Sequence, residues 1–178
     1  MENKDLFTGV KDGETFEVAG IEFIKFPDKN GVTPVVAKKL QFYSSFGENN
    51  NLSESEILRR MQEEWLPKVA EAIGAENLCQ IHTDLTTWDG LKPYQTLESL
   101  VSLPTMDFYR KHVDIFDKHK VDRSWWLATP YSAPPHDNDA WLLCVSPSGR
   151  VNNGGCDGDD GVRQFLALKS FIFGSFEK

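Results

Sequence analysis

The last third of the chain holds two strongly apolar segments on either side of a loose polar one. Residues 140–146 read AWLLCVS and are apolar at consecutive positions, which is typical of a strand covered on both faces. Residues 162–169, VRQFLALK, predict another strand. The stretch between them, GRVNNGGCDGDDG, is rich in Asn, Gly and Asp. A fold that accepts this sequence must fix both ends of a polar loop on buried strands.

The composition is that of one globular unit. With 178 residues, of which 40% are hydrophobic, the chain can build one core and does not require two, so residues 1–178 are predicted to form a single domain. The formal net charge of −8 argues against direct binding to nucleic acid or to an anionic membrane, because both need a basic face. Beside ordinary solubility, an acidic surface that docks on a basic protein partner is the alternative interpretation.

The first residues and the cysteines predict a cytoplasmic location, in a bacterium or a phage-infected host cell. MENKDLFTGV has neither the basic start nor the apolar run of a secretion signal. Cys79, Cys144 and Cys156 are odd in number and lack CxxC spacing, which fits neither a disulfide scaffold nor a zinc site. The sequence predicts no cofactor, and it leaves the oligomeric state open.

Alternation of apolar and polar residues predicts strands in the first and last parts of the chain. Residues 14–25 alternate around a turn at Ala19-Gly20 and predict a β-hairpin. Residues 33–44 predict the next strand, and RSWWLATP predicts a strand that ends at Pro130.

Two helices are expected between these strands. Ser53 and Glu56 form a capping box before the first helix, which Pro67 kinks or restarts and Gly74 ends. The buried face of the first helix is predicted to carry Leu58, Met61 and Trp65. Thr105 caps the second helix. The inward stripe of the second helix is predicted to be Tyr109, Val113 and Phe116. Together these elements predict an α+β fold with two main helices and a mostly antiparallel sheet.

Six short segments occur in an order that is shared with a known family. ETFEVAGIEFIKF, ILRRMQEEWL and LVSLPTMDFY are followed by WWLATP, GRVN and GVRQFLAL. In this order the chain resembles an uncharacterised bacterial family, domain of unknown function 6273, whose members end with WWLR-[ST]-P, G-x-V-N and GVRPAL. Ala128 stands where the family usually has Arg, and Gln164-Phe165 stands where it usually has Pro-Ala. No role of that Arg or Pro is therefore transferred to this chain.

The same ending is similar to that of formylglycine-generating-enzyme-like and C-type-lectin-like proteins, which commonly close with W, N and G-[FV]-R. This resemblance implies a compact α+β fold of one of these two types, in which the last strands hold long irregular loops. The resemblance also extends to the variable receptor-binding proteins of phages and bacteria. It implies that loops 131–139 and 150–161 form a recognition surface.

The candidate partner-binding residues lie in these loops and on the strands beside them. The loop residues are His136, Asp137, Asp139, Asn152, Asn153, Asp157, Asp159 and Asp160. Trp126 or Trp141 is the candidate aromatic anchor, and Trp125 is expected in the core. We interpret Arg163 as structural, because a buried guanidinium needs a carboxylate or several carbonyls. Its alternative role is to anchor an anionic ligand.

Metal binding and catalysis have less support in the sequence. CDGDDG offers three carboxylates but lacks the alternation and closing Glu of a calcium loop, so turn formation is favoured and calcium stays open. The four histidines lack ligand spacing and are interpreted as surface residues. No GxSxG, HExxH, P-loop or GxGxxG motif is present. Cys144 is expected in the core, and the Cys156 thiol in a flexible loop is expected to have a normal or raised pKa.

These observations favour a non-catalytic binding module that recognises a protein partner. The alternative is an acidic inhibitor encoded by a phage or mobile element, which binds a host defence protein such as a CRISPR nuclease. A copper- or calcium-dependent enzyme is the third hypothesis.

Overall fold

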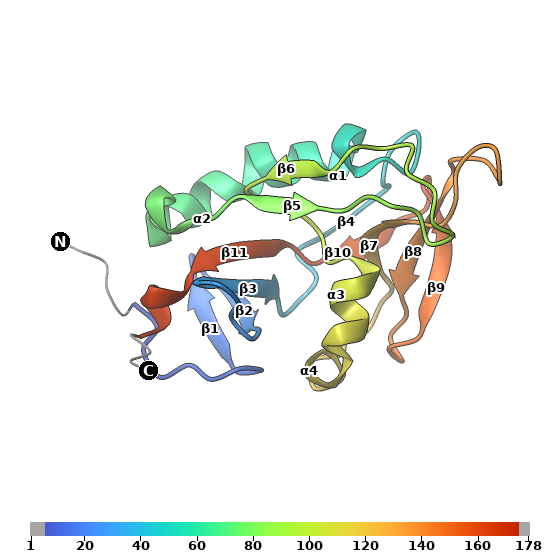
Figure 1. The fold of residues 1–178 in the computed structure, drawn as a ribbon. Helices are drawn as coiled ribbons and strands as arrows, with labels where there is room; N and C mark the ends of the chain where they lie inside the picture. Colours follow the sequence, from blue (N-terminus) through green and yellow to red (C-terminus); the bar gives the residue numbers. More distant parts are fainter. Residues whose placement is uncertain (1–5, 175–178) are drawn as a thin grey trace.

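Strands from both ends of the chain form two larger sheets and one small one. The computed structural model describes residues 6–174 (Figure 1). The first sheet has the order β1-β2-β3-β11, the second β4-β10-β7-β8-β9, and the third β5-β6. All pairs are antiparallel except β10 with β7. The strands are β1 (Thr15–Val18), β2 (Ile21–Lys25), β3 (Val32–Ala37), β4 (Phe42–Ser44), β5 (Ile81–Thr83), β6 (Leu97–Ser99), β7 (Trp125–Pro130), β8 (Trp141–Val145), β9 (Val151–Gly155), β10 (Asp160–Val162) and β11 (Phe165–Lys169).

An 18-residue helical stretch is the main helix of the fold. It consists of α1 (Glu56–Arg60), a π-helical turn (Met61–Trp65) and α2 (Leu66–Ile73). The predicted inward residues of this stretch are all buried. The restart predicted near Pro67 is confirmed, because the π-helical turn before it shifts the hydrogen-bond register where proline lacks an N–H. Gly74 ends the helix with a φ of +86°, as predicted.

The predicted cap of the main helix is wrong by two residues. The hydroxyl of Ser55, not that of Ser53, accepts the N–H of Leu58 at 3.0 Å. Ser53 lies in a short 3₁₀ turn (Leu52–Glu54), whose own cap is the side chain of Asn51. Two serines, Ser53 and Ser55, precede the helix, and the first of them lies in the 3₁₀ turn.

The second predicted helix is broken into two short ones. The Thr105 hydroxyl accepts the N–H of Phe108 at 3.2 Å and caps α3 (Met106–Lys111), as predicted. His112 leaves helical geometry, with φ −119° and ψ 27°, before α4 (Val113–Asp117). The break rotates Val113 to the surface, where it is 41% exposed, so its predicted inward position is wrong. Two further 3₁₀ turns complete the fold, at Ala75–Asn77 and Ser170–Phe173.

Two segments that each read as one strand are divided between the two larger sheets. The predicted strand 33–44 splits into β3 and β4, and VRQFLALK splits between β10 and β11. β11 pairs with β3 and β10 pairs with β4, so the two divided segments run side by side as one bent ribbon. The bend falls at Arg163 and Gln164, whose side chains are both fully buried.

The core has two parts, one on each face of the sheets. The main helix packs on one face with Trp65 and Val69, and Trp126 of β7 points into this part. α3 and α4 cover the opposite face, where Trp125 packs against Phe116. Figure 1 shows the main helix and the short helices on opposite sides of the sheets. The alternation of β7 therefore sends its two adjacent tryptophans into different halves of the core.

The predicted fold class is confirmed at the level of a compact α+β protein with mostly antiparallel sheets. The prediction of two main helices is corrected to one main helix and two short ones. Within residues 6–174, no helix has the length and apolar character needed to cross a membrane.

Candidate functional site

The two predicted loops meet at one end of the second sheet, but the second loop is shorter than predicted. Residues 151–155 form β9, whose Asn152 pairs with Cys144 and whose Gly155 pairs with Trp141. Only residues 156–159 remain as a connecting turn. The Asn and Gly content of β9 is typical of a loop, so the strand was not predicted. An edge strand with one partner needs few apolar side chains. We call the end formed by loop 131–139, Trp141 and the turn 156–159 the loop end.

Asn50 connects the segments of the loop end from inside. Its side chain is fully buried, and Nδ2 donates to the carbonyls of Ser132 at 2.8 Å and Trp141 at 3.0 Å. Its Oδ1 accepts the hydroxyl of Tyr94, and its backbone N–H donates to the carbonyl of Asp139. One buried residue thus connects loop 131–139, β8 and the segment around Tyr94. No local pattern singles out Asn50, because its partners are distant along the chain.

A second network holds loop 131–139 from outside. The carboxylate of Asp89 accepts the hydroxyls of Thr87 and Ser132, both at 2.6 Å, and the Nδ1–H of His136 at 2.9 Å. Hydrogen bonds from Ser132, Thr87 and His136 hold the pKa of Asp89 well below its usual range. Because the Ser132 hydroxyl donates directly to the carboxylate and not to the imidazole, this is not the order of a nucleophilic triad. The network anchors the loop.

Trp141 is the aromatic residue that the loop end exposes. Its side chain is 40% exposed, whereas its backbone is fixed by β8–β9 pairing and by the bond to Asn50. Trp88, at 51% exposure, lies near the same end, because its N–H donates to the carbonyl of Pro130. Trp126 is fully buried and its Nε1 donates to the carbonyl of Ser44, so its prediction as an anchor is wrong. The predicted core position of Trp125 is confirmed.

The acidic residues of the predicted surface divide into exposed and enclosed ones. Asp137, Asp139, Asp157 and Asp159 are exposed, as are His136, Asn152 and Asn153. Asp160 is half-buried beside the Cys144 thiol, and burial raises the pKa of its carboxyl. Asp160 is therefore less accessible than the other four carboxylates, and its role in partner binding stays a prediction.

Two of the three cysteines, Cys144 and Cys156, lie inside the fold, and Cys79 is half-buried. Burial raises the pKa of the Cys144 thiol to about 12, with a smaller contribution from nearby Asp160. Cys156 is also buried. Its backbone N–H donates to the carbonyl of Ala140, and its carbonyl accepts the N–H of Phe46. It lies at the start of the turn 156–159, and burial raises the pKa of its thiol, which agrees with the expected normal or raised pKa.

Arg163 is buried and paired with carbonyls, as predicted. Its Nε donates to the carbonyl of Ala37 at 3.0 Å, and its Nη2 donates to those of Lys38 at 3.0 Å and His119 at 3.3 Å. The predicted surface position of His119 is wrong in part, because the ring is half-buried and its Nε2–H donates to the carbonyl of Gly13. His112 is likewise half-buried, against Phe108.

Within residues 6–174, no three or more His, Cys, Asp and Glu side chains lie close enough together to hold a metal ion. Comparison with known proteins gives no match to a family model, a curated protein or a solved structure.

Proposed function

We propose that this protein is a non-catalytic binding module that recognises a protein partner through the loop end. The observation that carries this proposal is Trp141. A large aromatic side chain is 40% exposed while the backbone beneath it is fixed by two strands and by Asn50. Exposed aromatic residues on rigid supports are the usual anchors of protein interfaces, because they contribute much contact area and lose little conformational entropy.

The charge around Trp141 indicates the kind of partner. Asp137, Asp139 and Asp157 are exposed on the same end, and Asp139 and Glu54 both act on Tyr94 electrostatically. A partner with a basic patch complements this surface. This acidity also favours the second candidate function, an acidic inhibitor from a phage or mobile element that binds a basic surface of a host defence protein.

The way the last strands come together supports a more specific fold. We propose a C-type-lectin-like or formylglycine-generating-enzyme-like framework, because the three segments that suggested it come together. Trp125 of WWLATP pairs with Gly161 of GVRQFLAL, and GRVN runs into β9 on the neighbouring side of β8. In such a framework the last strands carry the recognition loops.

Loss of the aromatic anchor tests the proposed interface. We expect Trp141→Ala to lose a partner that the wild-type protein captures from bacterial lysate. Phe171→Ala is the matched control, because Phe171 is 44% exposed on a different part of the chain. Circular dichroism checks that both variants are folded. Retention of the partner by Trp141→Ala would remove the loop end from the interface.

Charge reversal separates the acidic-inhibitor hypothesis from a mainly apolar interface. Asp157→Lys with Asp159→Lys changes two exposed carboxylates, and Asp160 is left intact because it is half-buried. Glu71→Lys with Glu76→Lys gives the same change in net charge at the far end of the main helix. A partner bound through a basic surface should be lost only with the first pair and should dissociate as salt rises. A salt-insensitive complex would exclude the acidic-inhibitor mode.

A further inference from the structure

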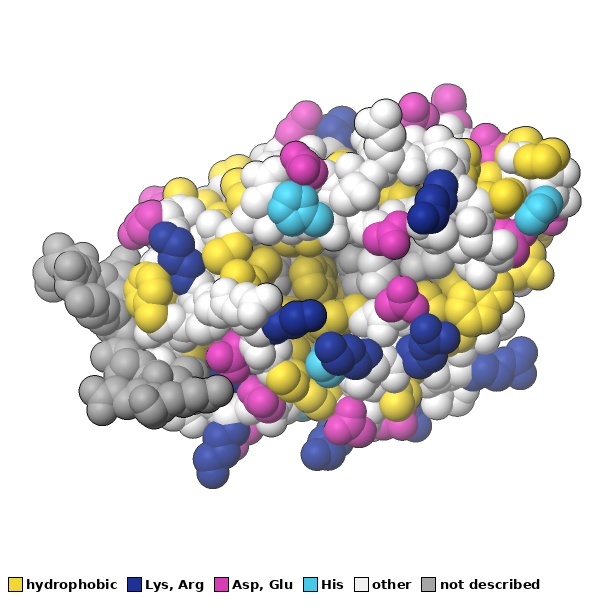
Figure 2. All heavy atoms as spheres, viewed as in Figure 1, with side chains coloured by type: hydrophobic (Ala, Val, Ile, Leu, Met, Phe, Trp, Pro, Cys, Tyr) yellow, Lys and Arg dark blue, Asp and Glu magenta, His cyan; other side chains and the backbone are white. Residues whose placement is uncertain are grey.

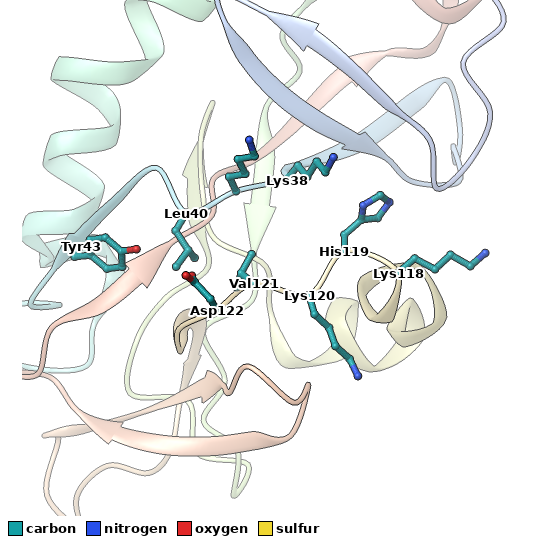
Figure 3. Close-up of a pocket in the computed structure, with 9 residues that line it drawn as sticks. Lys38, Leu40, Tyr43, Lys118, His119, Lys120, Val121 and Asp122 are labelled. Carbon is teal, nitrogen blue, oxygen red and sulfur yellow. The ribbon is translucent and has the colours of Figure 1, made fainter.

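A groove with a volume of about 620 Å³ lies between two segments that are far apart in the sequence. One wall is the link between β3 and β4 (38–41) together with Tyr43, and the other is the segment 118–122 after α4. Figure 3 shows Leu40, Val121 and Asp122 near the centre of the groove. The side chains of Lys118 and Lys120 project outward from this centre in different directions (Figure 3). The volume is in the range of sites for small organic ligands.

The groove is basic although the protein is acidic. Lys38, Lys39, Lys118 and Lys120 line it, with Asp122 as the one carboxylate in the lining. Glu22 lies 3.4 Å from the Nζ of Lys38 and 4.0 Å from that of Lys39. Within residues 6–174, neither Lys118 nor Lys120 forms an ion pair, so two exposed ammonium groups are free to bind an anion.

Figure 2 shows how the charges are distributed. Asp and Glu side chains lie along the main helix, and around α3 and α4 Lys and Arg side chains are interspersed with Asp and Glu. The net charge of −8 therefore does not describe every part of the surface. A local excess of positive charge attracts anions even when the whole protein repels them.

Arg163 adds a second, independent observation. Its side chain is 1% exposed, and its Nη2 bonds to the carbonyls of Lys38 and His119, one from each wall of the groove. The guanidinium lies 4.8 Å from the Trp125 ring, but within residues 6–174 it forms no ion pair with a carboxylate. Burial lowers its pKa to about 10, as expected for a cation without a counter-charge. Arg163 does not line the groove itself, but its two bonds fix the two walls relative to each other from inside the fold.

The groove also has an apolar side. Leu40 packs so closely on Gly161 that a Cβ there would stand 2.7 Å from a Leu40 methyl, so a side chain at this position would displace Leu40. Tyr43 is 41% exposed, and the guanidinium of Arg123 lies 4.1 Å from the centre of its ring. A ligand that fills the groove would therefore contact apolar side chains as well as charged ones.

We propose that this groove binds a small organic phosphate, with the phosphate held by the lysines and an apolar or aromatic moiety over Leu40 and Tyr43. The site lies apart from Trp141, and its charge is opposite to that of the loop end. It therefore adds a second binding activity to the proposed function and does not depend on it. Lysine is a common phosphate ligand, and its flexible side chain can close over a bound anion.

Calorimetric titration of the full chain tests the proposal. The probes are adenosine 5′-diphosphate, orthophosphate and adenosine. We expect the diphosphate to bind at one site, more tightly than orthophosphate, and adenosine to bind more weakly than the diphosphate. Lys118→Gln with Lys120→Gln should weaken diphosphate binding by about tenfold or more. Lys29→Gln with Lys68→Gln, which changes two exposed lysines elsewhere, should leave the affinity within about twofold of wild type.

Four results would overturn the proposal. They are the absence of saturable diphosphate binding by the wild-type protein, equal weakening by both lysine pairs, orthophosphate binding as tight as that of the diphosphate, and tighter binding of short single-stranded DNA than of the diphosphate. The last result would assign the groove to nucleic acid, since a strand would extend beyond its walls.

Discussion

Asn50→Ala is the change that most directly tests how the loop end is held together. The substitution removes two hydrogen bonds that Nδ2 donates to the carbonyls of Ser132 and Trp141, and one that Oδ1 accepts from Tyr94. The Trp141 carbonyl keeps the N–H of Tyr131 as a donor at 3.0 Å, so the loss falls mainly on the other two groups. At about 1 kcal/mol for each net hydrogen bond, with a further cost for an unpaired buried carbonyl, the free energy of unfolding should fall by about 2–4 kcal/mol.

Urea unfolding followed by tryptophan fluorescence measures this change, because the chain contains five tryptophans. Tyr94→Phe is the matched variant and should cost about 1 kcal/mol, since it removes one of the three bonds. The double variant should cost less than the sum of the two, by about the energy of the shared bond. A cost below about 1 kcal/mol for Asn50→Ala, or an equal cost for Tyr94→Phe, would refute the role of Asn50 as a connector.

Three further predictions concern other buried or paired groups. Gln164→Met should raise the free energy of unfolding in urea by about 1 kcal/mol, because the amide is fully buried and forms no hydrogen bond within residues 6–174. Asp89→Asn should destabilise the protein at neutral pH. Because the pKa of Asp89 is lowered in the folded state, the ionised carboxylate stabilises the fold above its unfolded pKa of about 4, and this stabilisation is lost as the pH falls below that value. The difference in free energy of unfolding between wild type and Asp89→Asn should therefore shrink in unfolding curves measured at decreasing pH. In the folded protein, Ellman's reagent at about pH 8 should quickly modify at most one thiol, that of half-buried Cys79, because Cys144 and Cys156 are buried and their pKa values are raised. In denaturant it should modify all three thiols. Rapid reaction of Cys156 in the folded protein would contradict its buried position.

The elements that periodicity predicted well are those whose pattern is local. The hairpin 14–25, the strand of WWLATP and the Thr105 cap depend on neighbouring residues, and all three are present. The division of 33–44 and of 162–169 between two sheets was missed, because alternation within a strand does not report which sheet it joins. β9 was missed for the opposite reason, since its pairing with β8 is made by backbone groups and leaves little trace in the side chains.

The candidate site was predictable in part for the same physical reason. Loops 131–139 and 150–161 meet as expected, because β8 carries one of them at each end and β9 returns beside it. Asn50 and Asp89 could not be singled out, since the bonds that connect each of them to Ser132 in loop 131–139 span more than 40 residues of the chain. Which of Trp125, Trp126 and Trp141 is exposed depends on what covers each face of the sheet, and this is a property of the assembled layers.

The groove shows what a net charge does not describe. A sum over the chain excludes anion binding only if charges of both signs are mixed evenly, and here residues 38–39 and 118–120 are brought together by the bent ribbon and α4. Arg123 joins this region to the loop end, because its guanidinium lies over Tyr43 while its Nη2 donates to the carbonyl of Asp159 at 3.4 Å. Arg123 does not line the groove, but it connects Tyr43 of the groove wall to the turn 156–159.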